Sequence, residues 1–562
     1  MAHPPSTSII RNKLLSTLPS TNTHRTLAIT SAAAQHGASA GITEADHGNN
    51  ALTDRNKNLR SAGMELANLH LYSVAAEVMS AGMQGGDDAA TAARQIELYK
   101  GLQSSSRAAL PATNPAAPVQ AAFLGLMDGT MNHELAMSSL SKHAYSSRES
   151  MERDVDKELA TIGFMRRLAE KSEMSESVLL DLIGGNTSFS SKGDDDHGWA
   201  VLAEVPGTDP DHTFVVKEDG AYRIVAGDKD NTDDNVPVGN EVLWALDHGK
   251  AGMARSLLDW KRDLTHKQGT DDPYEGPMLP HFWTKGSSKP GADSPEAMRL
   301  AGISLLAGSM DVKPYLAEIA ADREKANGQR QTDLDLLLAS SAIFAEQPAI
   351  GMPAAQRLLD QEPDSVLALN LVGRAYELQN DSKSWQAMLG PRLQKKPDDR
   401  DLLSSQAREL ELTHDFNAAQ ATQKKVLDSG KATSGDYNGY AWLGLFHNDL
   451  GDDITKAAQQ SAQLSKNSSF AELHTLACIY AAQGKTTEAR QVLQQAMDAA
   501  SLSEPNSEVW YALGLIYEQY GAKTAALEAF RHVQSHELDD HTFVDATATY
   551  VLAQSRIREL DK

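Results

Sequence analysis

Two stretches near the C-terminus share one pattern of residue types. Residues 470–497 read FAELHTLACIYAAQGKTTEARQVLQQAM, and residues 509–533 read VWYALGLIYEQYGAKTAALEAFRHV. Each has a Leu followed directly by a small residue, a Tyr three positions later, a Gly four positions after that and an Ala five further on. Steps of three and four residues are typical of one face of a helix, and the Gly marks a break. Each stretch therefore predicts two helices joined by a short turn.

The pattern recurs upstream at a regular interval. The small anchor residues Gly373, Ala407, Gly444, Ala477 and Gly514 lie 34, 37, 33 and 37 residues apart. This array, about residues 364–536, resembles the tetratricopeptide repeat family, whose two-helix unit has a period near 34 residues. The resemblance implies a superhelix with small residues where the two helices of a unit touch and large residues between units. The amphipathic residues 542–560 fit a capping helix.

Composition restricts the function classes. The 562 residues carry 52 Lys and Arg against 76 Asp and Glu, a formal charge of −24, which argues against nucleic-acid binding and anionic membrane surfaces. No run of about 18 apolar residues predicts membrane insertion. The single cysteine, Cys478, excludes an intramolecular disulfide and fits a reducing compartment. No export signal is visible, so we expect a cytoplasmic protein, and a periplasmic one remains an alternative if the N-terminus is incomplete.

In the middle of the chain the sequence pattern changes from that of helices to that of strands. Asp219-Gly220 suits a tight turn between strands at 213–217 and 221–225, and a third strand is expected at 199–205. These form a small antiparallel β-meander near residues 199–226, packed on helices because it is too small to stand alone.

The fold class is therefore mostly α, a tetratricopeptide-type solenoid of helix pairs with this meander inserted. The expected organisation is a disordered tail (1–50), a helical region (51–185), the meander unit (186–236), a helix pair (237–268), a Pro/Gly-rich linker (269–293), degenerate helical repeats (294–363) and the repeats with their capping helix (364–562).

No catalytic constellation emerges. His133-Glu134 begins like a zinc-protease helix, but Met137 stands where the second His is needed. Gly484-Lys485-Thr486 is explained as a turn within the repeat. Cys478 lies in mid-helix without the neighbouring cation that lowers a thiol pKa, so we interpret it as a packing residue. We expect no enzyme activity, cofactor or metal.

Binding residues follow from the resemblance alone. In this family the first helix of each unit lines the concave groove. The partner-binding positions carried over in this way are Asn370, Arg374, Arg408, Glu411, Asn438, Asn448, His474, Tyr511 and Glu518. Arg374 and Arg408, one repeat apart, could hold a carboxylate, and Tyr511 could anchor an apolar side chain. The recurring Lys of chaperone-binding members has no match, which disfavours a chaperone C-terminus.

Two functions are therefore predicted. The first is a non-enzymatic scaffold that binds a peptide or helix of another protein in the repeat groove. The alternative is an accessory protein with a small-ligand pocket in the 120–235 unit, docked to an enzyme through the repeats. A cavity lined by Trp199, Phe214 and Tyr222 would favour the alternative, and solid packing would favour the scaffold. The oligomeric state stays open.

Overall fold

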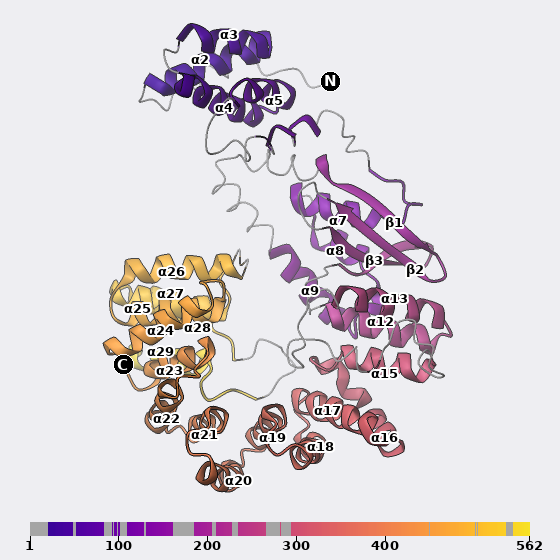
Figure 1. Cartoon of the computed structure of the whole chain (residues 1–562), viewed down its shortest axis with the longest axis vertical. Coiled ribbons are helices and arrows are strands. Elements are labelled where there is room, and N and C mark those ends of the chain that lie inside the picture. Colours follow the sequence, from indigo (N-terminus) through magenta and orange to yellow (C-terminus); the bar gives the residue numbers. More distant parts are fainter. Residues whose placement is uncertain are drawn as a thin grey trace. The chain divides into compact units, whose positions relative to one another are not determined.

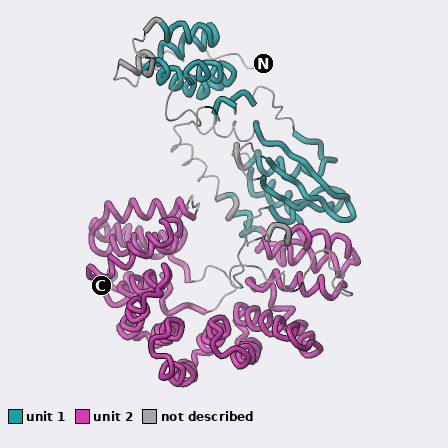
Figure 2. The backbone as a smooth tube through the Cα atoms, in the orientation of Figure 1, with its two compact units in different colours: residues 1–141, 152–229 teal, residues 142–151, 230–562 magenta. Residues whose placement is uncertain are grey.

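The structure is a computed structural model. It describes residues 21–48, 52–83, 93–101 without 94 and 98, 109–128, 131–160, 185–204, 210–227, 234–265, 282, 294–448, 450–500, 502, 504–535 and 543–562. The chain divides into two compact units (Figure 2), one of residues 1–141 and 152–229 and the other of residues 142–151 and 230–562.

The first unit begins with four helices packed on one another. They share a buried core that includes Ile29, Leu59 and Met79. Small residues permit the close approach, since a Cβ on Gly41 would lie 2.6 Å from the Cβ of Ala33. Residues 21–48 are thus helical, contrary to the predicted disordered tail, because Ala and Gly on one face supply a packing surface that composition alone does not reveal. The helices are α2 (Thr21–His36), α3 (Ala38–Gly48), α4 (Leu52–Asn68) and α5 (Tyr72–Ala81).

An antiparallel sheet in the order β1-β2-β3-β4 follows. The turn between β3 and β4 has positive φ at Asp219 (50°) and Gly220 (82°), which confirms the predicted hairpin. Val201 and Val215 are buried against Val119 of α7. The predicted meander lacked the first strand, whose Ser-rich sequence is exposed and does not alternate. The elements are β1 (Ser188–Asp194), β2 (Gly198–Glu204), β3 (Asp211–Glu218), β4 (Ala221–Ala226), α7 (Ala117–Asp128), α8 (His133–Ser139) and α9 (Arg148–Ala160).

The second unit is helical in all its described elements. Its first part holds a buried carboxylate, Asp335, bonded by Arg323 and Arg357 from the two flanking helices. Of the predicted linker only Phe282 is described; it is buried, and the Arg330 guanidinium lies 4.8 Å from its ring centroid. The elements are η1 (Lys142–Ala144), α12 (Asn235–Asp247), α13 (Ala251–Thr265), α15 (Pro295–Leu305), η3 (Met310–Tyr315), α16 (Leu316–Lys325), α17 (Gly328–Phe344) and α18 (Pro348–Gln361).

Five further helix pairs and a final helix complete this unit (Figure 1). The small anchors are placed as predicted: a Cβ on Gly373 would lie 2.7 Å from the Trp385 ring, and one on Gly514 would overlap the Phe530 ring. The pairs are α19 (Val366–Leu378) with α20 (Ser382–Lys395), α21 (Arg400–Leu412) with α22 (Phe416–Asp428), α23 (Ser434–Phe446) with α24 (Asp452–Leu464), α25 (Phe470–Ala482) with α26 (Thr486–Ala499), and α27 (Ser507–Gln519) with α28 (Lys523–Arg531), followed by α29 (Thr549–Leu560).

Every turn inside these five pairs contains one residue in the left-handed conformation. These residues are Asn380 (φ 53°), His414 (58°), Asn448 (58°), Gly484 (76°) and Gly521 (70°). Glu346, between α17 and α18, has the same conformation (φ 53°) and stands 34 residues before Asn380. The turn geometry of the array therefore begins at least one helix pair before residue 364.

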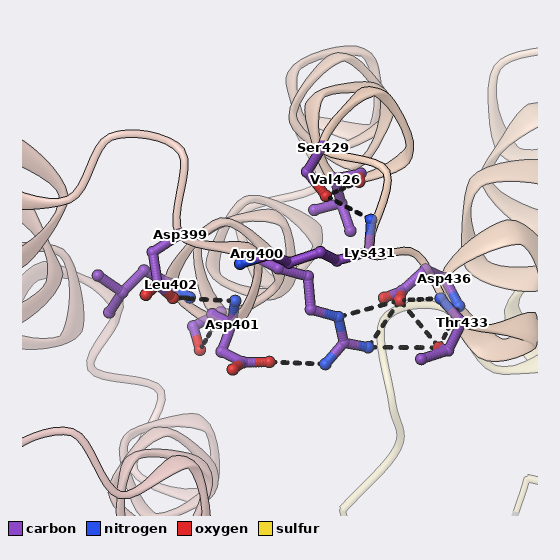
Figure 3. Close-up of polar contacts among 10 residues, drawn as sticks. Asp399, Arg400, Asp401, Leu402, Val426, Ser429, Lys431, Thr433 and Asp436 are labelled. Atoms are coloured by element: carbon purple, nitrogen blue, oxygen red, sulfur yellow. Dashed lines mark hydrogen bonds and ion pairs between the residues drawn. The ribbon is translucent and has the colours of Figure 1, made fainter.

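Neighbouring pairs are also joined by polar contacts. The Arg400 guanidinium lies between Asp401 and Asp436 (Figure 3), at 2.6 Å from a carboxylate oxygen of each. Asp436 in turn accepts a hydrogen bond from the backbone N–H of Thr433 at 2.8 Å, and Thr433 caps the same helix. One buried carboxylate thus closes the start of α23 and ties it to the start of α21.

Candidate functional site

The nine predicted binding residues fall into three environments. Asn370 and Asn448 are exposed, whereas His474 and Tyr511 are buried, with 4% and 2% of their surfaces accessible. The other five are half-buried on the first helices of their pairs: Arg374, Arg408, Glu411, Asn438 and Glu518.

Arg374 and Arg408 are brought together, as their spacing predicted. Both guanidinium groups bond the carboxylate of Glu377, whose side chain is 4% exposed. Arg408 also bonds Glu411 at 2.9 Å. Two positive and two negative side chains from α19 and α21 therefore form one charge-balanced cluster.

A cavity of about 410 Å³ lies beside this cluster. The Ser404 hydroxyl oxygen on its wall is buried and has no hydrogen-bond partner among the described residues. The cavity is lined by Asn370, Gly373, Arg374, Glu377, Trp385, Ser404, Ser405, Arg408 and Asp545.

The last of these lining residues belongs to the chain's own C-terminal segment. Asp545 lies opposite Arg408, and the two groups bond through both guanidinium Nη atoms. Arg374 stacks on Phe543, with its guanidinium carbon 4.4 Å from the ring centroid. The Trp442 indole N–H donates to the Thr547 carbonyl at 2.9 Å. Residues 543–547 thus cross the first helices α19, α21 and α23 in order.

Helix α29 continues from this segment. Its Leu552 and Ala553 are buried in the core of the last two pairs, and Arg556 bonds Glu518 of α27 with Nε 3.1 Å from a carboxylate oxygen. The capping helix begins at Thr549 rather than near residue 542. Glu518, a predicted partner contact, is therefore already bonded within the chain.

Three titratable groups of the cluster have shifted pKa values. Burial alone would raise the pKa of Asp545, but the Arg408 charge and hydrogen bonds hold it below its usual range. Burial raises the pKa of Glu411 despite the opposing effect of Arg408. The pKa of Arg408 is raised because Glu377 and Asp545 outweigh the effect of its burial. Arg408 is thus a cation at any pH at which the fold is stable.

The structure differs from the expectation for Tyr511 and His474. Neighbouring first helices α23, α25 and α27 pack directly together, so their shared side is filled by rings. Tyr511 lies 5.8 Å from Phe530 and 6.2 Å from Trp442 between ring centroids, and His474 lies 5.5 Å from Trp442. Neither offers an accessible anchor to a partner.

Asn448 is also placed differently. Helix α23 ends at Phe446, so Asn448 occupies the left-handed turn position, which Asn tolerates well, instead of a helical groove position. Asn438 keeps its place on α23, and its carboxamide oxygen is buried with no hydrogen-bond partner among the described residues.

Sequence reasoning missed four residues of the groove. Trp442 lies on a first helix but was not among the carried-over positions, and Phe543, Asp545 and Thr547 lie outside the repeats. Arg408 and Asp545 are 137 residues apart, and no periodicity links them. The signal in the sequence was charge: Asp545 is the one acidic residue in residues 542–549, and the predicted groove carries Arg374 and Arg408.

Among the aromatic residues of the sheet, Phe214 is tightly packed. Phe214 is 2% exposed, and a Cβ on Gly198 would lie 2.5 Å from its ring, so these two residues are in tight contact. Trp199 and Tyr222 both donate hydrogen bonds to Asp195, at 3.1 and 2.9 Å. Phe214 is therefore packed as the scaffold interpretation expects, whereas Trp199 and Tyr222 are half-buried and contact the exposed Asp195.

Within the described ranges, no three His, Cys, Asp or Glu side chains are grouped so that they could hold a metal ion. None of the helices described has both the length and the apolar character that crossing a bilayer demands.

Helix pairs at a period near 34 residues, with a left-handed residue in each turn, define an α-solenoid built from two-helix units. Residues 474–537 match the family model for the tetratricopeptide repeat, so the array consists of tetratricopeptide repeats. This confirms the predicted family and fold class.

Two solved structures are similar to the chain at low sequence identity. A tetratricopeptide repeat protein from Parabacteroides merdae ATCC 43184 is similar over 45% of this chain and 91% of its own, with 14% identity and a TM-score of 0.32. The anaphase-promoting complex (APC/C) hetero-tetramer Cut9-Hcn1 is similar over 99% of this chain and 94% of that one, with 12% identity and a TM-score of 0.31. No curated protein matches the chain in sequence.

Proposed function

We propose that the chain is a non-enzymatic scaffold that binds an extended segment of another protein in the groove formed by α19, α21 and α23. Tetratricopeptide repeats suggest a protein-interaction scaffold. The observation that carries the finer proposal is the arrangement of Arg374 and Arg408 beside a cavity of about 410 Å³ on the first helices. Paired guanidinium groups suit carboxylates, and the cavity leaves room for side chains of a partner.

Asn370 is the best reporter of this groove. It is exposed, lines the cavity and takes part in none of the ion pairs described above. Arg408 is a poor choice, because its removal would also disturb the fold through Glu377, Glu411 and Asp545.

The test is photo-crosslinking in the full chain. Asn370 is replaced by the photoreactive residue p-benzoylphenylalanine, and the matched control carries it at Ala421, exposed on the second helix α22. After irradiation in lysate of the source organism, we expect a distinct protein crosslinked at position 370 and absent at 421. The same proteins at both positions, or none at 370, would contradict the proposal.

The small-ligand alternative has weaker support. The tight contact of Phe214 with Gly198 leaves no room for a ligand beside that ring. The proposal also places the protein in a reducing compartment such as the cytoplasm, since its single cysteine is a buried free thiol. Nucleic acid is not a proposed partner, because the chain carries a formal charge of −24.

A further inference from the structure

We propose that residues 543–547, Phe-Val-Asp-Ala-Thr, are an intramolecular competitor for the partner site. In this inference the partner is an extended segment with an aspartate and an aromatic residue two positions before it, and it displaces the chain's own segment on binding. The inference rests on the proposed function and adds the chemistry of the ligand and its regulation.

Residues 543–547 contact the groove as a bound peptide would. They are not helical, since α29 begins at Thr549. Their contacts use both side chains and backbone: the Phe543 ring meets Arg374, the Asp545 carboxylate meets Arg408, and the Thr547 carbonyl accepts from Trp442. The Phe543 N–H also donates to Glu346 at 3.0 Å. Such a mixture of backbone bonds and side-chain contacts is how extended peptides are held by protein surfaces.

The segment is held loosely enough to leave. The Asp545 side chain is 35% exposed and Phe543 is half-buried. A cavity remains beside Asp545, so the segment does not fill its site. By contrast, Leu552 and Ala553 of α29 are buried in the core, with 6% and 0% exposure. The helix anchors the chain while the preceding residues can exchange.

The charged groups of the cluster stay paired when the segment leaves. If Asp545 leaves, Arg408 keeps Glu377 and Glu411, and Arg374 keeps Glu377. Departure therefore strands no unpaired buried charge, which is the usual obstacle to breaking such an ion pair. An incoming aspartate would restore the lost bond without any other rearrangement of the cluster.

The test measures binding of a labelled peptide to the full chain. The probe is a fluorescein-labelled peptide with the sequence of residues 541–548, HTFVDATA, followed by anisotropy. A partly closed site lowers the apparent affinity in proportion to the open fraction. We therefore expect the Asp545→Ala chain to bind the probe about tenfold or more tightly than wild type, because the lost charge-assisted bonds favour the open groove. A probe in which the aspartate is replaced by Ala should bind that same Asp545→Ala chain with about tenfold lower affinity.

Two controls make the result decisive. Asp561→Ala removes an exposed acid at the end of α29 and should behave like wild type. If Asp545→Ala does not fold, Asp545→Asn takes its place in the test, because it removes the charge and keeps the shape of the side chain. Equal affinity of wild type and both Asp545 variants for the probe, or no binding by any folded variant, would overturn the inference.

Failure of this inference can be told apart from failure of the proposed function. The crosslinking test at Asn370 is repeated in the Asp545→Ala chain. If the partner crosslinks equally with and without Asp545, the scaffold proposal stands and the competitor is refuted. If crosslinking rises in the variant, both are supported. If no partner appears in either chain while the probe binds the variant, the scaffold proposal fails and with it the displacement by a partner, and only the groove's affinity for a segment like residues 543–547 is supported.

Discussion

Arg408 on α21 is bonded through both Nη atoms to Asp545, 137 residues further along the chain. The same guanidinium bonds Glu377 and Glu411, so one side chain connects two repeats and the C-terminal segment. A residue that the repeat pattern assigns to partner binding thus also supports the fold. Loss of binding in an Arg408 variant would not by itself locate a partner, and for this reason the experiments above leave Arg408 intact.

The single cysteine gives a local probe of the array. Cys478 is fully buried in α25, and burial raises the pKa of its thiol far above the ordinary value. Because the thiolate is the reactive form, we expect no reaction with Ellman's reagent in native buffer and one thiol per chain in denaturant. Rapid stoichiometric labelling of the native protein would contradict this packing.

Two glycines on first helices should respond oppositely to the same substitution. A Cβ at Gly514 would overlap the buried Phe530 ring, whereas at Gly439 the nearest side-chain atom would be 3.8 Å away. We expect Gly514→Ala to destabilise the array by about 1–3 kcal/mol through overpacking. Gly439→Ala should stabilise it by up to about 1 kcal/mol, because Ala favours the helix more than Gly does.

The measurement is the urea concentration at which Cys478 becomes reactive, since Cys478 lies in the same buried cluster as Phe530. A midpoint for Gly514→Ala at or above that of wild type would show that the two helices of this repeat are not in close contact.

The sequence predicted the array because its determinants are local and periodic. Gly373 and Gly514 stand where only a small residue fits against a ring, and Gly484 and Gly521 stand in turns that require positive φ. Such requirements repeat with each unit and are readable from one chain. The β-hairpin was predicted for the same reason, because Asp219-Gly220 is a dipeptide that readily adopts the positive φ of a tight turn.

The groove was only partly predictable, because its occupants are set by tertiary structure. The spacing of Arg374 and Arg408 indicated that they share a surface, but not that Asp545 and Phe543 lie across them. Tyr511 was assigned by repeat position, and the direct packing of first helices, which buries it, depends on how tightly the superhelix closes. Periodicity fixes which residues face inward and does not fix how much room is left there.

The contact between α21 and α23 in Figure 3 gives a third prediction. The Asp436 side chain is 6% exposed and bonds Arg400 at 2.6 Å. It also accepts from the backbone N–H of Thr433, the N-cap of α23, and so forms half of a capping box. Asp436→Ala leaves the Thr433 N-cap in place but removes the Asp436 half of the capping box and the charge-assisted bonds to Arg400, and we expect a loss of about 2 kcal/mol in stability. The Cys478 midpoint in urea measures it.

The matched control for Asp436 is Asp428→Ala. Asp428 is 64% exposed and pairs with Lys424 one turn away, so its loss should change the midpoint little. Equal effects of the two substitutions would mean that the Arg400 contact contributes nothing to the array.

His474 predicts how the stability of the array depends on pH. The imidazole is buried in α25, and burial lowers its pKa to about 4, although the bond to the Glu508 carbonyl opposes this shift. A carbonyl only accepts, so Nε2, 2.9 Å from the Glu508 oxygen, carries the proton of the neutral ring. A second proton, on Nδ1, would place a positive charge on a ring that packs against Trp442 and Phe470.

The lowered pKa of His474 means that the stability of the array falls as the pH falls. In the unfolded chain the histidine binds a proton near its ordinary pKa of 6.5, and in the fold it does so only near 4, so the unfolded state gains protons first as the pH falls. The array should lose about 2 kcal/mol of stability between pH 7 and pH 5 from this residue. His474→Gln, neutral throughout, should flatten the pH profile of the Cys478 midpoint. Substituting the exposed His532 with Gln should leave the profile as in wild type, and an unchanged profile in His474→Gln would refute the buried neutral imidazole.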